Sequence, residues 1–277
     1  MIRVKEVKVK RRNLLVANII LMIISIIGCK YIFEVETTKK VYAAETVKFL
    51  EENRNPVFAI EKIELWSSAY AVDNSDGDLK DIDISQFTDI ILYIDNKLKT
   101  DEITAENTVS QLFIDNIKIE SENENGERIF NYKNPYNAGK YVELSNWQGD
   151  GILFNVLNTN EKNKNADYNA NVFYTDCSNP ISLGLVNKNI LTGCEVNNNG
   201  SLTFDGSILE KAGIELEGLK ARVSFIVHII NNYEEAFLCD VSFDIDLTKN
   251  NNAIYKGFAK QEIKVKDEEF NFIKVHE

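Results

Sequence analysis

Residues 236–247 read AFLCDVSFDIDL, and their alternation decides the fold class. One set of positions is apolar and consists of Phe237, Cys239, Val241, Phe243, Ile245 and Leu247. The other set is polar and consists of Asp240, Ser242, Asp244 and Asp246. Because successive side chains of a strand point to opposite faces, this pattern predicts a half-buried antiparallel strand.

The segments around this strand also have the pattern of strands. Residues 220–230 (KARVSFIVHII) precede it, and Asn231-Asn232 between them predicts a hairpin turn. Further strand-like runs lie at 58–66, 89–95, 111–120 (whose start fits a helix equally well), 140–144, 151–157, 172–175, 181–186, 190–196 and 254–265. One interior helix is predicted at 205–213, and no helices recur between strands. The chain is therefore expected to be all-β, as one large antiparallel β-sandwich or two packed Ig-like sandwiches.

The N-terminal part has a different character. Residues 14–29 (LLVANIILMIISIIGC) carry no charge, and Arg3, Lys5, Lys8, Lys10, Arg11 and Arg12 precede them. Since a cationic flank stays in the cytoplasm, the chain should leave the cell after this segment. We expect a basic cytoplasmic flank at 1–12, a transmembrane anchor or signal at 13–33, a linker at 34–55 and an extracytoplasmic domain at 56–277.

Three mechanisms of export fit the N-terminal segment. In a transmembrane helix, residues 31–33 would extend the apolar run past Lys30, whose ammonium group reaches the head groups. In a lipoprotein, residues 26–29 (IIGC) would form the signal, and Cys29 would be acylated. In a secreted protein, cleavage would follow the small residues of Tyr42-Ala43-Ala44. All three place the β domain outside the cytoplasmic membrane.

The distribution of charge along the chain limits the classes of partner that can be expected. Six cationic residues and Glu6 give residues 1–12 a net charge of +5. Because the whole chain carries −12, the chain after residue 12 carries −17. Such an acidic body repels phosphate backbones, which excludes nucleic acid as an expected partner. The expected partners are the cytoplasmic membrane, through residues 14–33, and an envelope polysaccharide or protein.

Two stretches resemble known sequences. Residues 55–65 (NPVFAIEKIEL) and 175–181 (TDCSNPI) resemble those of uncharacterised single-span surface proteins of clostridia-type bacteria. The resemblance implies a location at the cell surface, and no known activity comes with it.

The cysteines and histidines indicate no metal or redox centre. Cys177 and Cys194 flank a predicted hairpin, where a disulfide would close a loop of about 17 residues; two unpaired thiols are the alternative. Cys239 lies on the apolar face of its strand and is expected in the core. No CxxC motif occurs, and His228 has no nucleophile motif beside it, so neither zinc nor nucleophilic catalysis is predicted.

Two polar loops contain weak binding candidates. Residues 73–78 (DNSDGD) offer Asp73, Asp76 and Asp78, but an EF-hand with its glycine at position 77 would begin at Val72 instead of an aspartate. Residues 146–151 (NWQGDG) offer Trp147 and Asp150, where the indole ring either stacks on a sugar or plugs the end of the sandwich. Trp66, at the end of a strand, is expected in the core.

No phosphate-binding glycine loop is present in the sequence, and no cofactor is predicted. These features predict a non-enzymatic surface protein with a binding or structural role. The alternative is an envelope polysaccharide hydrolase, which would need two carboxylates about 5–10 Å apart in a cleft.

Overall fold

The chain forms two compact units, residues 1–55 and 56–277. The computed structural model describes residues 2–52, 56–76, 80–96, 108–121, 126–133, 141–142, 147–148, 151–157, 171–173, 181–195, 204–264 and 270–275, with the side chains of the first helix described from Ile20 onward. The second unit begins at Pro56, the residue at which the predicted β domain begins.

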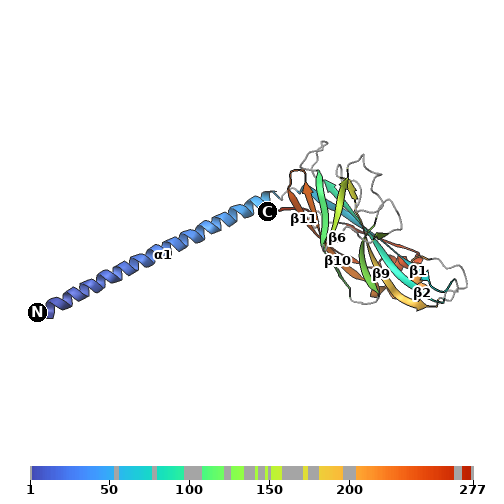
Figure 1. Cartoon of the computed structure of the whole chain (residues 1–277), viewed down its shortest axis with the longest axis horizontal. Coiled ribbons are helices and arrows are strands. Elements are labelled where there is room, and N and C mark those ends of the chain that lie inside the picture. Colours follow the sequence, from blue (N-terminus) through green and yellow to red (C-terminus); the bar gives the residue numbers. More distant parts are fainter. Residues whose placement is uncertain are drawn as a thin grey trace. The chain divides into compact units, whose positions relative to one another are not determined.

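The first unit is a single helix, α1 (Ile2–Glu52), which Figure 1 shows as one uninterrupted rod. Its 51 residues correspond to a length of about 76 Å. The predicted linker at 34–55 is thus helical as far as Glu52. The reason is local, because no glycine or proline interrupts the sequence between Gly28 and Pro56. Within the described residues, no helix is both long and apolar enough to cross a membrane.

The second unit consists of two sheets whose described strands are almost all antiparallel, which confirms the all-β prediction (Figure 1). The first sheet has the order β12-β1-β2-β9-β4-β5, and the second has the order β13-β11-β10-β3-β7-β6, with β8 parallel to β7. The strands of the first sheet are β1 (Phe58–Asp73), β2 (Ile82–Asn96), β4 (Glu127–Lys133), β5 (Tyr141–Val142), β9 (Ile181–Cys194) and β12 (Ala259–Lys264). The strands of the second are β3 (Val109–Glu120), β6 (Trp147–Gln148), β7 (Gly151–Leu157), β8 (Asn171–Phe173), β10 (Ala221–Asn231), β11 (Ala236–Ile245) and β13 (Ile273–Val275).

One hydrophobic core lies between the two sheets, as in a β-sandwich. Phe58 of β1 meets Phe237 of β11 edge-on, with ring centroids 5.4 Å apart. The ring centroids of Phe130 in β4 and Phe225 in β10 are 6.1 Å apart, which is a second aromatic contact between the two sheets. Burying large apolar side chains from both sheets supplies most of the driving force for folding.

The decisive hairpin has the predicted register. Residues Phe237, Cys239, Val241, Phe243 and Ile245 are buried, whereas Asp240, Ser242 and Asp244 are exposed. Asn231 forms the turn, since its Oδ1 accepts hydrogen bonds from the backbone N–H groups of Tyr233 and Glu235, each at 2.9 Å. An asparagine side chain in this arrangement stabilises a turn locally.

Three predicted elements differ in the structure. The β3 strand is extended from its first residue, not helical at its start. The predicted strands at 181–186 and 190–196 are one strand, β9. Residues 253–256 form the 3₁₀ helix η3 (Ala253–Lys256) instead of a strand, after a short helix α3 (Lys249–Asn252).

The reason for the last difference is backbone conformation. Asn250, Asn251 and Asn252 have φ angles of 57°, 55° and 54°, in the left-handed region that asparagine tolerates better than most residues. The chain therefore turns before β12 begins. The predicted interior helix is present as α2 (Ser207–Lys211), followed by the 3₁₀ helix η2 (Leu216–Leu219).

Candidate functional site on the outer face of the second sheet

The strands β3, β10 and β11 present a polar outer face. In β10, Val223, Phe225, Val227 and Ile229 are buried, so Arg222, Ser224, Ile226 and His228 lie on the opposite side. The register places Ser224 beside Ser242 and Ile226 beside Asp240. Cross-strand neighbours on one face are close enough for both to contact one ligand.

A β-bulge modifies this face. Between Ser224 and Ile226 of β10, the pairing with β3 shifts from Lys118 to Asp115, so β3 contains one extra residue. Asn116 lies in this bulge with a φ of 50°. Bulges change the direction of side chains and are common beside functional sites.

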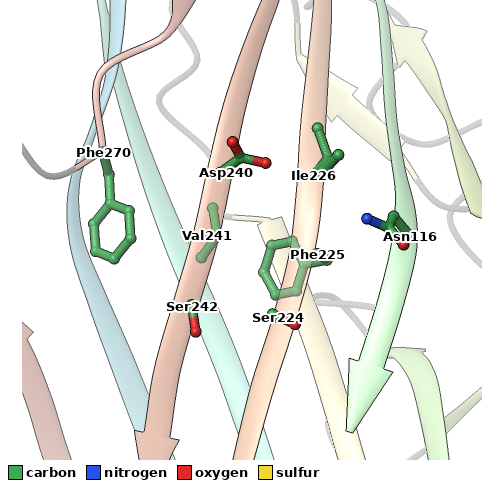
Figure 2. A pocket seen from close by; sticks show the side chains of 8 residues that line it. All are labelled: Asn116, Ser224, Phe225, Ile226, Asp240, Val241, Ser242 and Phe270. Carbon is green, nitrogen blue, oxygen red and sulfur yellow. The ribbon is translucent and has the colours of Figure 1, made fainter.

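Beside the bulge lies an open surface depression of about 550 Å³. Figure 2 shows Asn116, Ile226 and Asp240 on three neighbouring strands, with Ser224 and Ser242 below them. Asn116, Asp240 and Ser242 are exposed. These amide, carboxylate and hydroxyl groups can donate and accept hydrogen bonds. The apolar half of the lining consists of Phe225, Ile226, Val241 and Phe270.

His228 is held on the same face by two neighbours. Its Nε2 lies 2.8 Å from Oδ1 of Asp115, and its ring stacks on Phe113 with centroids 3.9 Å apart. Among the described residues, no serine or cysteine side chain is hydrogen-bonded to His228. His228 is therefore a packed histidine on the outer face of the sheet.

Asp115 and Asp240 are the two carboxylates on this face that could serve the polysaccharide hydrolase considered as the alternative function. Asp115 and Asp240 flank Ile226 from both sides, two strand spacings or about 10 Å apart at their backbones. Yet the Asp240 side chain is exposed, and Asp115 is engaged by His228. A general acid for glycoside hydrolysis needs a carboxyl group that its surroundings keep protonated, usually by burial. Asp240 is thus open to solvent, whereas Asp115 is already hydrogen-bonded within the sheet.

The acidic turn between β1 and β2 is closed by its own hydrogen bonds. Oδ1 of Asp73 accepts from the backbone N–H and the hydroxyl group of Ser75, at 2.9 and 2.6 Å. Asp76 is exposed, with a φ of 53°, and Asp78 lies outside the described residues. In the part of the chain that the structure describes, no three His, Cys, Asp or Glu side chains are placed to hold a metal ion.

Trp147 lies in β6 and not in an open loop. Its backbone pairs with that of Ile152, and Gln148 pairs with Gly151, so β6 runs antiparallel to β7. Asp150 lies outside the described residues, and only the backbone of Trp147 is described. The predicted sugar-binding role of this pair stays a prediction.

The cysteines are thiols wherever the structure describes them. Cys29 is exposed on α1, and Cys239 is buried in the core, where burial raises the pKa of its thiol to about 12. Cys194 is free and donates to the carbonyl oxygen of Ile82 at 3.2 Å.

The disulfide predicted between Cys177 and Cys194 involves a residue outside the described part of the chain, so it stays a prediction. The hairpin that the two cysteines were expected to flank is one continuous strand, β9, which ends at Cys194.

The sequence did not reveal a polar network inside the sandwich. Ser67 and Thr88 hydroxyl groups lie 2.7 Å apart, Gln86 donates to Thr88 at 2.8 Å, and Asn187 donates to Gln86 at 2.6 Å. All four side chains are buried. The signal in the sequence is their parity, because Ser67 and Thr88 occupy the same inward set of positions as Leu65 and Ile90.

Comparison with known proteins identifies no relative: no family model, no curated protein and no solved structure matches the chain.

Proposed function

We propose that the protein is a membrane-tethered surface protein whose β domain lies outside the cytoplasmic membrane and has a non-enzymatic binding or structural role. The observation that carries the proposal is the distribution of apolar side chains on α1. Ile20, Leu21, Met22, Ile23 and Ile24 are consecutive and 51–68% exposed.

Five consecutive residues at 100° per residue cover every side of a helix. A helix that is apolar all round is normally buried in a protein core or in a bilayer. Burying each such side chain contributes about 1.5–3 kcal/mol. The apolar run starts at Leu14, before the first described side chain, and continues to Phe33, which is 72% exposed. A bilayer would remove this surface from water.

The basic flank supports the orientation. Six cationic residues precede Asn13, and cationic residues beside a span remain in the cytoplasm. The β domain would then follow on the outer side. A transmembrane helix is our preferred anchor, since α1 continues without interruption past Cys29, with acylation of Cys29 as the second candidate.

The polar outer face supports a binding role. Asn116, Ser224, Asp240 and Ser242 form the polar half of an open depression, where they suit hydrogen bonding to a ligand that also has apolar surface. This part of the proposal predicts no turnover. Purified protein incubated with labelled cell walls should release no soluble fragments, and release that Asp240→Asn abolishes would overturn it.

The location is tested with the full chain carrying a C-terminal epitope tag, expressed in a Gram-positive bacterium. We expect the tag in the membrane pellet after alkaline carbonate extraction, and its loss when intact cells are treated with protease. A tag in the soluble cytoplasmic fraction, or one protected in intact cells, would contradict the proposal.

The mass of the mature protein separates the three anchors. A retained N-terminus supports the transmembrane helix, an acylated Cys29 supports the lipoprotein, and a new N-terminus near Ala44 supports secretion. Cys29→Ala should leave the protein in the membrane pellet. If Cys29→Ala releases the protein from the membrane pellet, the anchor is the acylated Cys29 and not the transmembrane helix.

A further inference from the structure

The outer face of the first sheet contains a cluster of aromatic and charged side chains, which we call the Trp66 platform. It consists of Lys62, Glu64 and Trp66 on β1, Lys260 on β12, and Phe258 just before β12. The register of β1 and β12 pairs Trp66 with Lys260 and Glu64 with Glu262. The platform lies on the sheet opposite to the depression of Figure 2.

Two aromatic rings of the platform face solvent. Trp66 is 38% exposed, so the expectation that it lies in the core is wrong. Phe258 is 59% exposed. Their rings are nearly parallel, at 9°, with centroids 6.1 Å apart. Rings with a structural role in this protein are buried instead, since Phe58 and Phe272 are at most 1% exposed.

A buried carboxylate fixes the position of the indole ring. Glu64 accepts hydrogen bonds from the Trp66 Nε1–H group at 3.2 Å and from the Lys62 ammonium group at 2.9 Å. The Lys260 Nζ lies 3.2 Å from Oε2 of Glu64, the oxygen that also accepts from Trp66, whereas Lys62 donates to Oε1. These donors, with Lys62 first, lower the pKa of Glu64 to about 2. The ring is thus held in one orientation before any ligand arrives, which reduces the entropy cost of binding.

The two lysines have donors left for a ligand. An ammonium group has three N–H donors, and Glu64 engages one from each lysine. The side chains of Lys62 and Lys260 are 35% and 41% exposed. Lys62 Nζ also lies 4.2 Å from the centre of the Tyr93 ring, and Lys260 Nζ lies 4.7 Å from that of Trp66. The ammonium groups of Lys62 and Lys260 thus lie over the Tyr93 and Trp66 rings and keep N–H donors for a ligand.

We infer that the Trp66 platform binds a polysaccharide of uncharged pyranose rings. The C–H groups on the face of a pyranose pack against an aromatic ring, whose face carries partial negative charge. The hydroxyl or acetamido groups at the rim of the sugar accept hydrogen bonds from Lys62 and Lys260. The exposed ring of Phe258, which stacks on Trp66, is the face on which a pyranose unit packs.

Charge favours an uncharged polymer over an anionic one. Glu64 offsets one of the two lysine charges, and the chain outside residues 1–12 carries −17. A polyanion would be repelled by such a body at long range. An uncharged polysaccharide meets the same donors without this repulsion.

The test uses the full chain in a zwitterionic detergent without a sugar head group. Hexasaccharides of β-1,4-linked N-acetylglucosamine and of β-1,4-linked glucose are titrated, with polygalacturonate as the anionic comparison. Isothermal titration calorimetry measures the affinity of every variant, and in Trp147→Phe, where Trp66 is the sole tryptophan, fluorescence separately reports binding at the platform. We expect saturable binding of at least one hexasaccharide, weakened at least tenfold by Trp66→Ala and by Phe258→Ala.

Tyr233→Ala is the matched control, because Tyr233 is 61% exposed but lies at the β10–β11 turn of the other sheet. This variant should bind as the parent does, and all variants should keep the parent's denaturation midpoint within a small margin. Absence of binding by both hexasaccharides at millimolar concentration, unchanged binding by the Trp66 and Phe258 variants, or a preference for polygalacturonate would each overturn the inference. The result is independent of the anchor, which the cell fractionation tests separately.

Discussion

The helix α1 and the β-sandwich contain the same apolar residue types in opposite environments. In α1, Ile23, Ile24 and Ile27 are 52–63% exposed. In the sandwich, Ile63, Ile84 and Ile90 are completely buried. The second unit buries its apolar surface between its two sheets, whereas the apolar surface in the described part of α1 is exposed.

This difference indicates what covers the apolar surface of each unit. The alternation of β1 and β2 gives each strand one apolar face, and the facing sheet covers it. The apolar segment of α1 has no polar face, so a single protein neighbour would cover part of it and a bilayer would cover all of it. The following four experiments test this contrast.

The largest effect should come from charging the apolar segment. In the double substitution Ile23→Lys and Ile27→Lys, each lysine costs about 2.5–3.5 kcal/mol at the centre of a membrane span. We expect the protein to leave the membrane pellet almost completely. The matched control, Thr38→Lys with Tyr42→Lys, has the same spacing beyond the segment and should stay membrane-bound. Equal behaviour of the two variants would mean that the segment does not anchor the chain.

The next effect concerns the buried contact between the sheets. Phe58→Ala removes a ring that contacts Phe237 and Phe272 at centroid distances of 5.4 and 6.2 Å. We expect the free energy of unfolding to fall by about 3–5 kcal/mol, because a cavity replaces the ring. Denaturant titration measures it, with the exposed Tyr233→Ala expected to stay within about 0.5 kcal/mol. A loss below about 1 kcal/mol would argue against a shared core at this place.

A smaller effect should follow from the buried polar network. Thr88→Val keeps the shape of the side chain but removes the hydroxyl group that bonds to Ser67 and Gln86. Leaving these buried groups without that partner should reduce the free energy of unfolding by about 1–3 kcal/mol. Thr192→Val, at an exposed position of β9, is the control. Stabilisation by Thr88→Val would show that the network costs more than it contributes.

The smallest effect is the acid sensitivity of the platform. The pKa of Glu64 is lowered from 4.5 to about 2, so its contribution is present above pH 4.5 and is lost as the pH falls toward 2. Because its lysine partners are partly exposed and solvent screens their charges, we expect a loss of about 1 kcal/mol. Glu64→Gln should lack this part of the pH dependence, measured as the difference in unfolding free energy between pH 5 and pH 2. Parallel profiles for both proteins would contradict it.

Local pattern was sufficient for much of the fold. The alternation of 236–245 gave the register of β11, and the Asn231-Asn232 pair gave its turn. Elsewhere short-range signals misled, because the residues at 187–189 suggested a turn within β9. There Asn189 takes a φ of 54° inside one continuous strand. Pairing with β2 and β4 on both sides compensates for that irregularity.

The candidate sites depended more on tertiary structure. Trp147 stood out in the sequence because glycine and asparagine surround it, while Trp66 looked like a core residue at the end of a strand. Parity indicates the opposite for Trp66, since its neighbours Leu65 and Ser67 point inward. The cross-strand neighbour of Trp66 is Lys260, which lies 194 positions away in the sequence. The pairing of β1 with β12 brings the two residues together, and no local pattern shows this pairing.

By itself the sequence determined the all-β class, the separate apolar segment and its basic flank, because periodicity and charge are properties of neighbouring residues. The tertiary structure alone decided which polar residues meet: Asp115 with His228, Gln86 with Asn187, and Glu64 with Trp66 and two lysines. The physical reason is that strand pairing brings together residues far apart in the chain, and their contacts depend on register and bulges that the hydrophobic pattern leaves open.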